Sequence, residues 1–380
     1  MRQREGLCVI KVLNVISDTN IGGAGKCVLT FLKYYSKDEF DLAVVIPKNS
    51  LLKPEIEKLG ARCIEVDALA DKSLDFKAVS RLLKIFKAEK PDVIHCHAAM
   101  SARIAGRLYK RAKIVYTRHS VFEPSPAISR GIGKRINGFV NNATADRIIA
   151  VADAAKDNLT KTGVSDKKIT VIQNGVEPLK PLPESEKQKI RSEYGVGEND
   201  FILGIAASLN EVKGHIYILE ALKLLIDDGI TNAKLIIAGT GDYEDTIRRK
   251  IAELNLGENV VMAGFVKDVS GFMNILSVNV NASFGTEATS LALLEGMSLG
   301  VPAVVSDFGG NPGVIEEGVN GYLFESKNSR QMYEKLKLAL QNGIALKDMC
   351  KKVFEERFRA EIMTEKIQQV YRNLAKEIRK

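Results

Sequence analysis

The 380 residues, 45% hydrophobic and 27% charged, are typical of a soluble globular protein. At about 100–200 residues per domain they predict two domains. No apolar stretch approaches the roughly 18 residues that span a bilayer, and the five cysteines form no C-x-x-C pair, which argues against a membrane span, a disulfide framework and a zinc site. The net charge of +8 comes with no Trp and no recognition motif, which argues against nucleic-acid binding.

The amino-terminal segment is expected to form a first β-strand over residues 9–16. The apolar run of this segment is broken by Lys11 and Asn14 and lacks a small-residue cleavage site, which argues against a signal peptide. Short apolar runs then alternate with helical patterns such as 25–35 and 76–87. Further strands are expected at 41–46, 61–66, 93–95, 114–117, 147–151 and 169–172.

Basic residues are concentrated in the first half of the chain. Residues 1–180 hold 31 Lys and Arg against 19 Asp and Glu, a net charge of +12, whereas the remainder holds 24 against 28, a net charge of −4. The segments "SRLLKIFKAEK", "SARIAGRLYKRAK" and "SRGIGKRINGF" place apolar residues between their cations at helical spacing. Such faces attract anionic lipid headgroups or an anionic substrate; the alternative is an ordinary solvated helix face.

A linker is expected at "NGVEPLKPLPESEKQK", which brings three prolines together. A second alternating series follows, with strands at 201–206, 234–238, 260–262, 278–281, 303–305 and 322–324 and an amphipathic terminal helix. The pattern predicts an α/β protein of two Rossmann-like, doubly wound parallel-sheet domains facing across a cleft. We expect the domains at 1–178 and 179–357, with a carboxyl-terminal helix at 358–380 crossing back to the first domain.

The stretch "FGTEATSLALLEGMSLGVP" holds two carboxylates, one of them inside an apolar run. Glu295 follows four apolar residues, where an unpaired buried charge is costly, so it requires a partner in the protein or in a ligand. Thr289 or Ser290 is expected to cap a helix that starts near Leu291, and the amino end of such a helix is a ready phosphate site. Glu295 could then accept from ribose hydroxyls; the alternative is a bond to neighbouring backbone.

The arrangement E-x7-E from Glu287 to Glu295, followed by "GVP" and "SDFGGNPGVIEEGVNGYLF", resembles the family-4 retaining glycosyltransferases of GT-B fold. "IGGAGKCVLTFLKYY", "PDVIHCHAAMSARIAGRL", "IVYTRHS", "KITVIQNGVEP", "EVKGHIYILEAL" and "LIIAGTGDYEDTIRRKIAEL" continue the resemblance in the family's order. It covers nearly the whole chain. It implies transfer of a hexose-type sugar from a nucleotide sugar, with UDP as the expected nucleotide, to a saccharide or lipid-linked acceptor in bacterial surface or exopolysaccharide synthesis.

The resemblance also implies roles for individual residues. His119, Lys213 and Glu287 would act at the reacting centre, with Lys213 neutralising the diphosphate and Glu287 contacting the donor sugar. Glu295 would hold the ribose. The remaining residues implied at the donor are Gly22, Gly23, Ser208, Asn210, Gly239, Thr289, Ser290, Leu291, Gly310 and Asn311. No cofactor and no metal is expected, since the chain has no Asp-x-Asp triplet and His95 and His97 lack a third ligand.

Two departures from the family pattern keep alternatives open. Ser208 or Asn210 stands where the family has a second cation, and Ala288-Thr289-Ser290 replaces its glycine turn. A non-catalytic nucleotide-sugar-binding partner subunit and a nucleotide-sugar epimerase are therefore the alternatives to the transferase. We expect a cytoplasmic protein whose basic first half can attach peripherally to the inner face of the plasma membrane.

Overall fold

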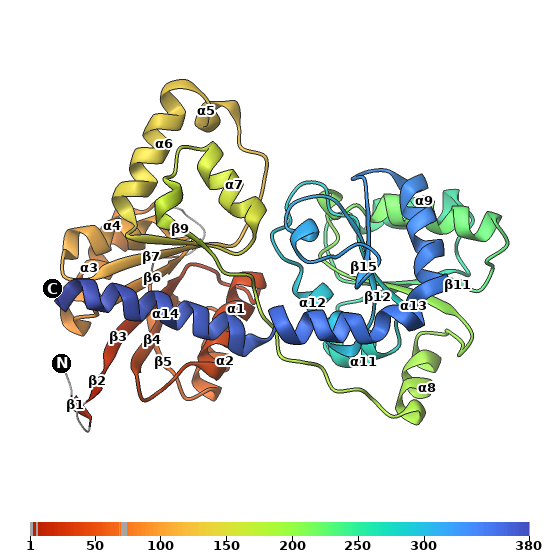
Figure 1. Cartoon of the computed structure of the whole chain (residues 1–380), viewed down its shortest axis with the longest axis horizontal. Helices are drawn as coiled ribbons and strands as arrows, with labels where there is room; N and C mark the ends of the chain where they lie inside the picture. Colours follow the sequence, from red (N-terminus) through yellow and green to blue (C-terminus); the bar gives the residue numbers. More distant parts are fainter. Residues whose placement is uncertain (1–2, 5–6, 68, 70–73, 380) are drawn as a thin grey trace. The chain divides into compact units, whose positions relative to one another are not determined.

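The computed structural model describes residues 3–4, 7–67, 69 and 74–379. The chain divides into two compact units (Figure 1). Unit 1 comprises Met1–Gly175 and Ala360–Lys380, and unit 2 comprises Val176–Arg359.

Unit 1 is built on a seven-stranded parallel sheet with the order β5-β4-β3-β6-β7-β8-β9. Its strands are β3 (Ile10–Ile16), β4 (Phe40–Pro47), β5 (Arg62–Val66), β6 (Val93–His97), β7 (Lys113–Arg118), β8 (Arg147–Ala150) and β9 (Ile169–Val171). Its helices are α1 (Gly23–Tyr34), α2 (Leu52–Lys58), α3 (Phe76–Glu89), α4 (Met100–Tyr109), α5 (Pro126–Ser129), α6 (Gly131–Thr144), α7 (Asp153–Lys161) and α14 (Ala360–Arg379). A short antiparallel pair, β1 (Gln3–Arg4) and β2 (Leu7–Cys8), was not predicted.

Successive side chains of the central strand β3 enter two different cores, as the period of two in a strand requires. Val12 packs with Phe31 of α1 and Tyr371 of α14 on one face of the sheet. Leu13 packs with Phe86 of α3 on the other face. Tyr371 is fully buried, so the carboxyl-terminal helix α14 is an integral part of unit 1.

Unit 2 is built on a six-stranded parallel sheet with the order β12-β11-β10-β13-β14-β15. Its strands are β10 (Phe201–Ala206), β11 (Ala233–Ala238), β12 (Val260–Gly264), β13 (Val278–Asn281), β14 (Ala303–Ser306) and β15 (Gly321–Phe324). Its helices are α8 (Glu184–Glu193), α9 (His215–Asp227), α10 (Glu244–Glu253), α11 (Val269–Asn274), α12 (Leu291–Leu299) and α13 (Ser329–Arg357). Leu203 of β10 packs with Leu222 of α9 and Leu336 of α13. The next residue towards the amino end, Ile202, packs with Phe272 of α11 on the opposite face.

The predicted fold class is confirmed. Every strand expected from the sequence is present, with ends that differ by at most two residues. In each sheet the strand order reverses once, between β3 and β6 in unit 1 and between β10 and β13 in unit 2. Ligands of such sheets bind at the carboxyl ends of the strands beside this reversal, so each unit has one edge where a site is expected.

Candidate functional site

In unit 2, the residues predicted to bind the donor lie in loops that leave the carboxyl ends of four strands. Ser208, Asn210 and Lys213 follow β10, and Gly239 follows β11. The segment from Glu287 to Ser290 follows β13, and Gly310 with Asn311 follows β14. Because the strands are parallel, all four loops emerge at the same edge of the sheet.

Lys213 and Glu287 form an ion pair at this edge. Lys213 Nζ lies 2.9 Å from Glu287 Oε2 and also donates to the carbonyl oxygen of Thr286 at 3.3 Å. The Glu287 side chain is 8% exposed and that of Lys213 is 19% exposed. A pair at this depth is far less screened than one on the open surface, so both charges keep a strong local field.

Two further donors hold the same carboxylate oxygen. Asn281 Nδ2 and Ser283 Oγ each donate to Glu287 Oε2 at 3.1 Å. Both residues stand at or just after the end of β13. Neither was predicted, because a single polar residue at the end of a strand gives no periodic signal in the sequence.

A second layer of hydrogen bonds connects this loop with the one after β14. Ser306 Oγ donates to the Ser283 carbonyl oxygen at 2.6 Å, and Asn311 Nδ2 donates to the Ser306 carbonyl oxygen at 3.1 Å. Asn311 is fully buried, and its Oδ1 has no hydrogen-bond partner within the described part of the chain. Asn311, which was predicted to bind the sugar donor, is therefore a buried residue that stabilises this loop by hydrogen bonding.

Two glycines permit the close backbone approaches that build the site. Gly309 has φ +63°, and a Cβ there would lie 2.1 Å from the carbonyl oxygen of Glu287. Gly214 has φ +71°, and a Cβ there would lie 2.1 Å from the carbonyl oxygen of Ala282. Any other residue would push apart the loops that carry Lys213 and Glu287.

The helix α12 begins at Leu291, as predicted, and ends at Leu299, with the predicted Gly300 at the C-cap position, where its φ is +84°. Ser290, one of the two residues expected to cap the helix, occupies the N-cap position, and its side chain makes no capping hydrogen bond. Its carbonyl oxygen accepts from the backbone N–H of Leu293 at 3.2 Å. Glu295 is half-buried, and its carbonyl oxygen accepts from Ser298 Oγ at 2.6 Å. The amino end of α12 carries partial positive charge beside the Lys213–Glu287 pair.

Ser208 and Asn210 provide polar but uncharged groups at the same edge. Both are exposed, and Asn210 Nδ2 donates to Ser208 Oγ at 2.9 Å. Gly239 lets β11 and the loop after β10 approach, because a Cβ there would lie 1.9 Å from the Ala207 carbonyl oxygen. The second cation of the family pattern is thus replaced here by a hydrogen-bonded hydroxyl and amide.

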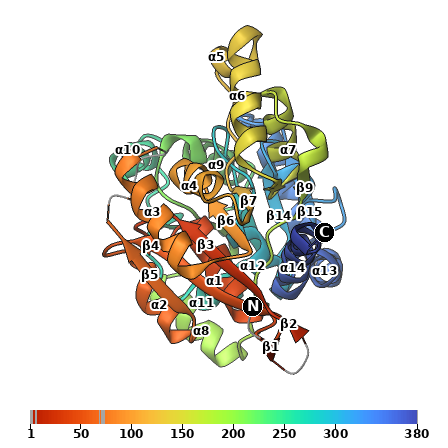
Figure 2. The same cartoon turned by 90° about the vertical axis from the view of Figure 1, so that its left-hand side faces the viewer.

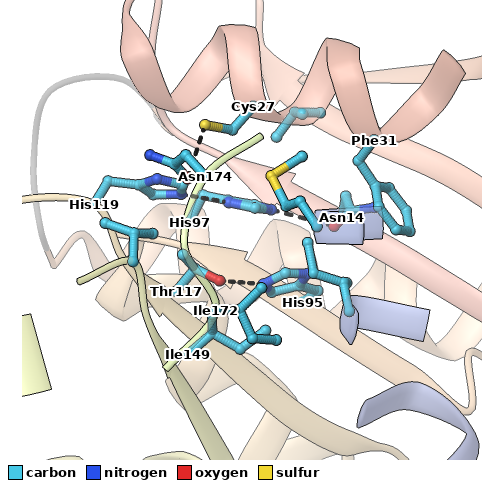
Figure 3. Close-up of a pocket in the computed structure, with 14 residues that line it drawn as sticks. Asn14, Cys27, Phe31, His95, His97, Thr117, His119, Ile149, Ile172 and Asn174 are labelled. Carbon is cyan, nitrogen blue, oxygen red and sulfur yellow. Dashed lines mark hydrogen bonds between the residues drawn. The ribbon is translucent and has the colours of Figure 1, made fainter. Parts of the chain in front are cut away.

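In unit 1, His119 belongs to a polar cluster at the carboxyl ends of β3, β6 and β7 (Figure 3). His119 Nε2 lies 2.8 Å from His97 Nδ1, and His97 Nε2 lies 3.2 Å from Asn14 Oδ1. With the Asn14 oxygen facing His97, His97 carries its proton on Nε2 and accepts through Nδ1. The proton of His119 is then on Nε2, and its Nδ1 is left as an acceptor. Sequence reasoning predicted His119 and missed the other two.

The neighbouring His95 is held by two hydroxyl groups. Its Nδ1 lies 2.6 Å from Tyr371 Oη, and its Nε2 lies 2.6 Å from Thr117 Oγ1. Desolvation by burial lowers the pKa of His95 to about 3 and that of His119 to about 4. Burial also lowers the pKa of His97 well below its usual value. All three rings are therefore neutral near pH 7.

These groups line a cavity of about 20 Å³ beneath α1 and α14. A hydrogen bond of 3.3 Å from Cys27 Sγ to Asn174 Oδ1 closes one side of the cavity. Burial raises the pKa of the Cys27 thiol to about 12. Gly22 and Gly23 stand exposed at the start of α1, with nothing within 4 Å of a Cβ built at either position. They leave the amino end of that helix open to solvent.

The part of the chain that the structure describes contains no metal-ligand cluster and no membrane-spanning helix. No group of three or more His, Cys, Asp or Glu residues there could hold a metal ion. Among the helices that the structure describes, none combines the length and apolarity required to traverse a bilayer.

Comparisons with known proteins agree with this architecture. The family model "Glycosyltransferase Family 4" matches residues 21–179, and "Glycosyl transferases group 1" matches residues 186–356. The chain is 27% identical over 328 residues to the UDP-Gal:alpha-D-GlcNAc-diphosphoundecaprenol alpha-1,3-galactosyltransferase of Escherichia coli, covering 83% of this chain and 84% of that protein. It is 26% identical over 275 residues to the O-antigen biosynthesis glycosyltransferase WclY of Escherichia coli, covering 70% and 74%.

A solved structure shares the fold over nearly the full length. Anabaena Alr3699/HepE, crystallised in complex with UDP, superimposes with a TM-score of 0.83 at 21% identity, covering 96% of this chain and 100% of that one. The two family models together account for most of the chain, and they match it in the order of its two units. The protein is therefore a glycosyltransferase of family 4, with the GT-B fold.

Proposed function

We propose that the protein is a retaining, metal-independent glycosyltransferase that moves a hexose-type sugar from a UDP-sugar to a saccharide or lipid-linked saccharide. The observation that carries the proposal is the Lys213–Glu287 ion pair at the carboxyl edge of the unit 2 sheet, beside the amino end of α12. Departure of a nucleoside diphosphate develops negative charge on phosphate oxygens. A lysine and a helix amino end are suited to stabilise that charge.

In this proposal unit 2 binds the donor. Lys213 neutralises the diphosphate, Glu287 orients the donor sugar and Glu295 accepts from the ribose hydroxyls. Thr289, Ser290 and Leu291 supply hydroxyl and backbone donors to phosphate at the start of α12. Because Glu287 is held by three donors on one oxygen, its position is fixed before any sugar arrives, which lowers the cost of orientation.

Unit 1 is proposed to bind the acceptor and to contribute His119 to the transferred sugar. Its neutral ring presents Nδ1 as a hydrogen-bond acceptor at neutral pH, so it is suited to a sugar hydroxyl rather than to phosphate. Gly22 and Gly23 leave room for a ligand at the start of α1.

The names of the relatives support the substrate classes. The Escherichia coli enzyme is named for a UDP-sugar donor and a diphosphoundecaprenol-linked acceptor, and WclY is named for O-antigen biosynthesis. The Anabaena protein has been crystallised with UDP-glucose. We therefore propose UDP as the nucleotide, a lipid-linked saccharide as the acceptor, and surface-polysaccharide synthesis at the cytoplasmic face of the membrane as the setting.

A thermal-shift panel of UDP-, GDP-, ADP- and TDP-sugars tests the donor site. UDP-sugars should raise the melting temperature of the wild type, and Glu295→Ala should lose most of that rise. The matched control is Glu253→Ala, an exposed glutamate at the end of α10, which should respond like the wild type. If Glu295→Ala keeps the full rise, the ribose role is wrong.

Product analysis then distinguishes the reactions. An NMR assay with donor and a lipid-linked acceptor should show transfer with the anomeric configuration of the donor retained. Donor binding without transfer to any acceptor would instead indicate a non-catalytic partner subunit. Conversion of the donor with no acceptor present would indicate an epimerase.

A further inference from the structure

The hydroxyl group of Tyr371 is buried next to the histidine cluster of unit 1. Tyr371 lies on α14, which contacts β3, β6 and β7 on one face of the sheet (Figure 1) and is seen end-on in Figure 2. The ring of Tyr371 packs edge to face against Phe31 of α1 and Phe40 of β4, with the ring centroids 5.9 Å apart in both pairs. The apolar part of the side chain is therefore placed by core packing.

Core packing does not explain why this residue carries a hydroxyl group. The neighbouring residues of α14 that enter the same core are apolar, namely Ile367, Val370 and Leu374. A buried hydroxyl costs free energy unless it has a hydrogen-bond partner, and Tyr371 Oη lies 2.6 Å from His95 Nδ1. Burial raises the pKa of the Tyr371 hydroxyl, so it keeps its proton at neutral pH. The hydroxyl thus serves the contact with His95.

His95 is the first of three histidine rings that lie in a row (Figure 3). The ring centroids of His95 and His97 are 4.2 Å apart with the planes tilted by 36°, and those of His97 and His119 are 5.1 Å apart at 25°. A hydrogen bond of 2.8 Å also joins His97 to His119. Because protein interiors are close-packed, the position of each ring limits the position of the next.

Two hydroxyl groups fix the orientation of His95 at the start of this row. Tyr371 holds one ring nitrogen, and Thr117 Oγ1 holds the other, Nε2, at 2.6 Å. A neutral imidazole has one donor and one acceptor nitrogen, so one hydroxyl accepts a hydrogen bond and the other donates one. Loss of the Tyr371 hydroxyl would leave a buried nitrogen without its partner, and the ring would shift to find another.

We propose that Tyr371 is a positioning residue for glycosyl transfer, which holds His119 in place through the rings of His95 and His97. The inference rests on the proposed function, in which His119 contacts the transferred sugar. His95 is 1% exposed and His97 is 6% exposed, whereas His119 is partly exposed. The row therefore leads from the buried helix α14 to the ring that a ligand can reach. A group from the last helix of the chain completes the site in unit 1.

Steady-state kinetics of full-length Tyr371→Phe test the proposal, because phenylalanine keeps the packed ring and removes the hydroxyl alone. We expect kcat to fall about tenfold with little change in the donor KM, since a displacement of 1 Å at the reacting centre costs about a hundredfold and the two intervening rings absorb part of it. In a His119→Ala background the same substitution should have no further effect.

Tyr333→Phe is the matched control. Tyr333 is 7% exposed, and its hydroxyl lies 2.8 Å from Asp228 Oδ2 in unit 2. The variant likewise removes one hydrogen-bonded hydroxyl from a buried ring, and its kcat should equal that of the wild type. Thr117→Val removes the other hydroxyl that holds His95 and should lower kcat as Tyr371→Phe does.

NMR of histidine-labelled protein reports the rings directly and needs no substrate. The chain has four histidines, and the ¹⁵N shifts of each ring give its tautomer. Tyr371→Phe should shift the ring signals of His95, His97 and His119 and leave those of His215, which lies in unit 2, unchanged. Tyr333→Phe should leave the signals of His95, His97 and His119 unchanged.

The two measurements separate this inference from the proposed function. An unaltered kcat in Tyr371→Phe would overturn the positioning role, and so would an equal loss in the wild-type and His119→Ala backgrounds, which would indicate general damage. If the wild type transfers no sugar, the proposed function fails and the NMR result alone decides the ring contacts. A shift confined to His95 would then show that Tyr371 does not hold His119.

Discussion

Lys213 Nζ lies 2.9 Å from Glu287 Oε2, although the two residues are 74 positions apart in the chain. The contact joins the loop after β10 to the loop after β13, the two strands between which the sheet order reverses. It places a cation and an anion together at one end of the proposed donor site. The pair also keeps Lys213 from being an isolated charge in the protein without ligand.

Replacement of Lys213 by Ala should lower kcat by about 10²–10³, the usual cost of removing one electrostatic donor to a developing anion. KM for the donor should change much less, because the charge on the phosphate is largest in the transition state. Lys223→Ala is the control, since Lys223 pairs with Asp227 on the outer surface of α9. Steady-state kinetics that show a higher KM and an unaltered kcat would refute the leaving-group role.

Gly309 should be intolerant of a side chain. Gly309→Ala places a Cβ 2.1 Å from the Glu287 carbonyl oxygen at φ +63°, so the loop that carries Glu287 must move. We expect a loss of donor affinity together with a loss of about 2–4 kcal/mol in the free energy of unfolding, from backbone strain and overpacking.

Gly318→Ala is the matched variant for this test. Gly318 has a similar φ of +71°, but nothing lies within 4 Å of its Cβ position. It should lose only about 1 kcal/mol, the cost of a left-handed alanine, and keep full donor affinity. Equal effects in the two glycines, measured by urea unfolding and donor titration, would show that the contact with Glu287 is unimportant.

His97 should act through His119 rather than alone. The 2.8 Å contact between their rings, backed by Asn14, holds the ring of His119 and fixes its proton. We expect His119→Ala to lower kcat about a hundredfold and His97→Ala about tenfold, with the double variant no slower than His119→Ala. His97→Gln retains a side-chain acceptor and should recover part of the rate. Fully additive losses in the double variant would show that the two rings work independently.

Acidification should destabilise the protein through its four histidines. Burial lowers the pKa of His95 to about 3 and the pKa values of His119 and His215 to about 4, and it also lowers the pKa of His97. Below the unfolded pKa of about 6.5 the unfolded chain binds protons that the native protein does not, so stability falls as pH falls. Between pH 6.5 and 5 the loss should be about 1.5 kcal/mol for each of His95, His119 and His215.

Urea unfolding midpoints at intervals across this range measure the effect. Because both ring nitrogens of the buried His215 have no hydrogen-bond partner among the described residues, His215→Leu should remove one histidine's share of this loss. A separate loss of stability begins below pH 4.5. The hydrogen bond from Arg62 holds the pKa of Glu89 at about 2 in the native protein, so in this range the unfolded chain binds a proton that the native carboxylate does not. A midpoint constant from pH 6.5 to 5 would contradict the neutral state of the buried rings.

Much of the fold could be predicted from the sequence because the strands bury both faces. Runs such as residues 201–206 and 235–238 are continuously apolar, and a turn or a helical pattern follows each of them. The start of α12 was also predictable, because Ser290 precedes an apolar run that ends in Gly300. The antiparallel pair of β1 and β2 was not predictable, since each strand has only two residues.

The candidate site was predictable only where a motif carried it. Glu287, Lys213 and His119 were named from segments that resemble a family. Asn281, Ser283 and Ser306 were missed because single polar residues at strand ends carry no periodic signal. The contact between His97 and Asn14 likewise depends on the register of two strands that are distant in the sequence. Across β3 and β6, this register pairs Asn14 with His95 and Ile16 with His97.

The sequence by itself determined the two parallel sheets, the order of their elements and the basic character of the first half, because periodicity and charge are local properties of the chain. Tertiary structure alone decided that Lys213 contacts Glu287, that the rings of His97 and His119 contact each other, and that α6 turns its isoleucines and phenylalanine outward. These depend on strand order, on register and on the close approach of Gly138 to Gly163, all of which involve residues distant in sequence. Local pattern cannot specify which side of a helix meets the protein when the contacts that fix it come from another part of the chain.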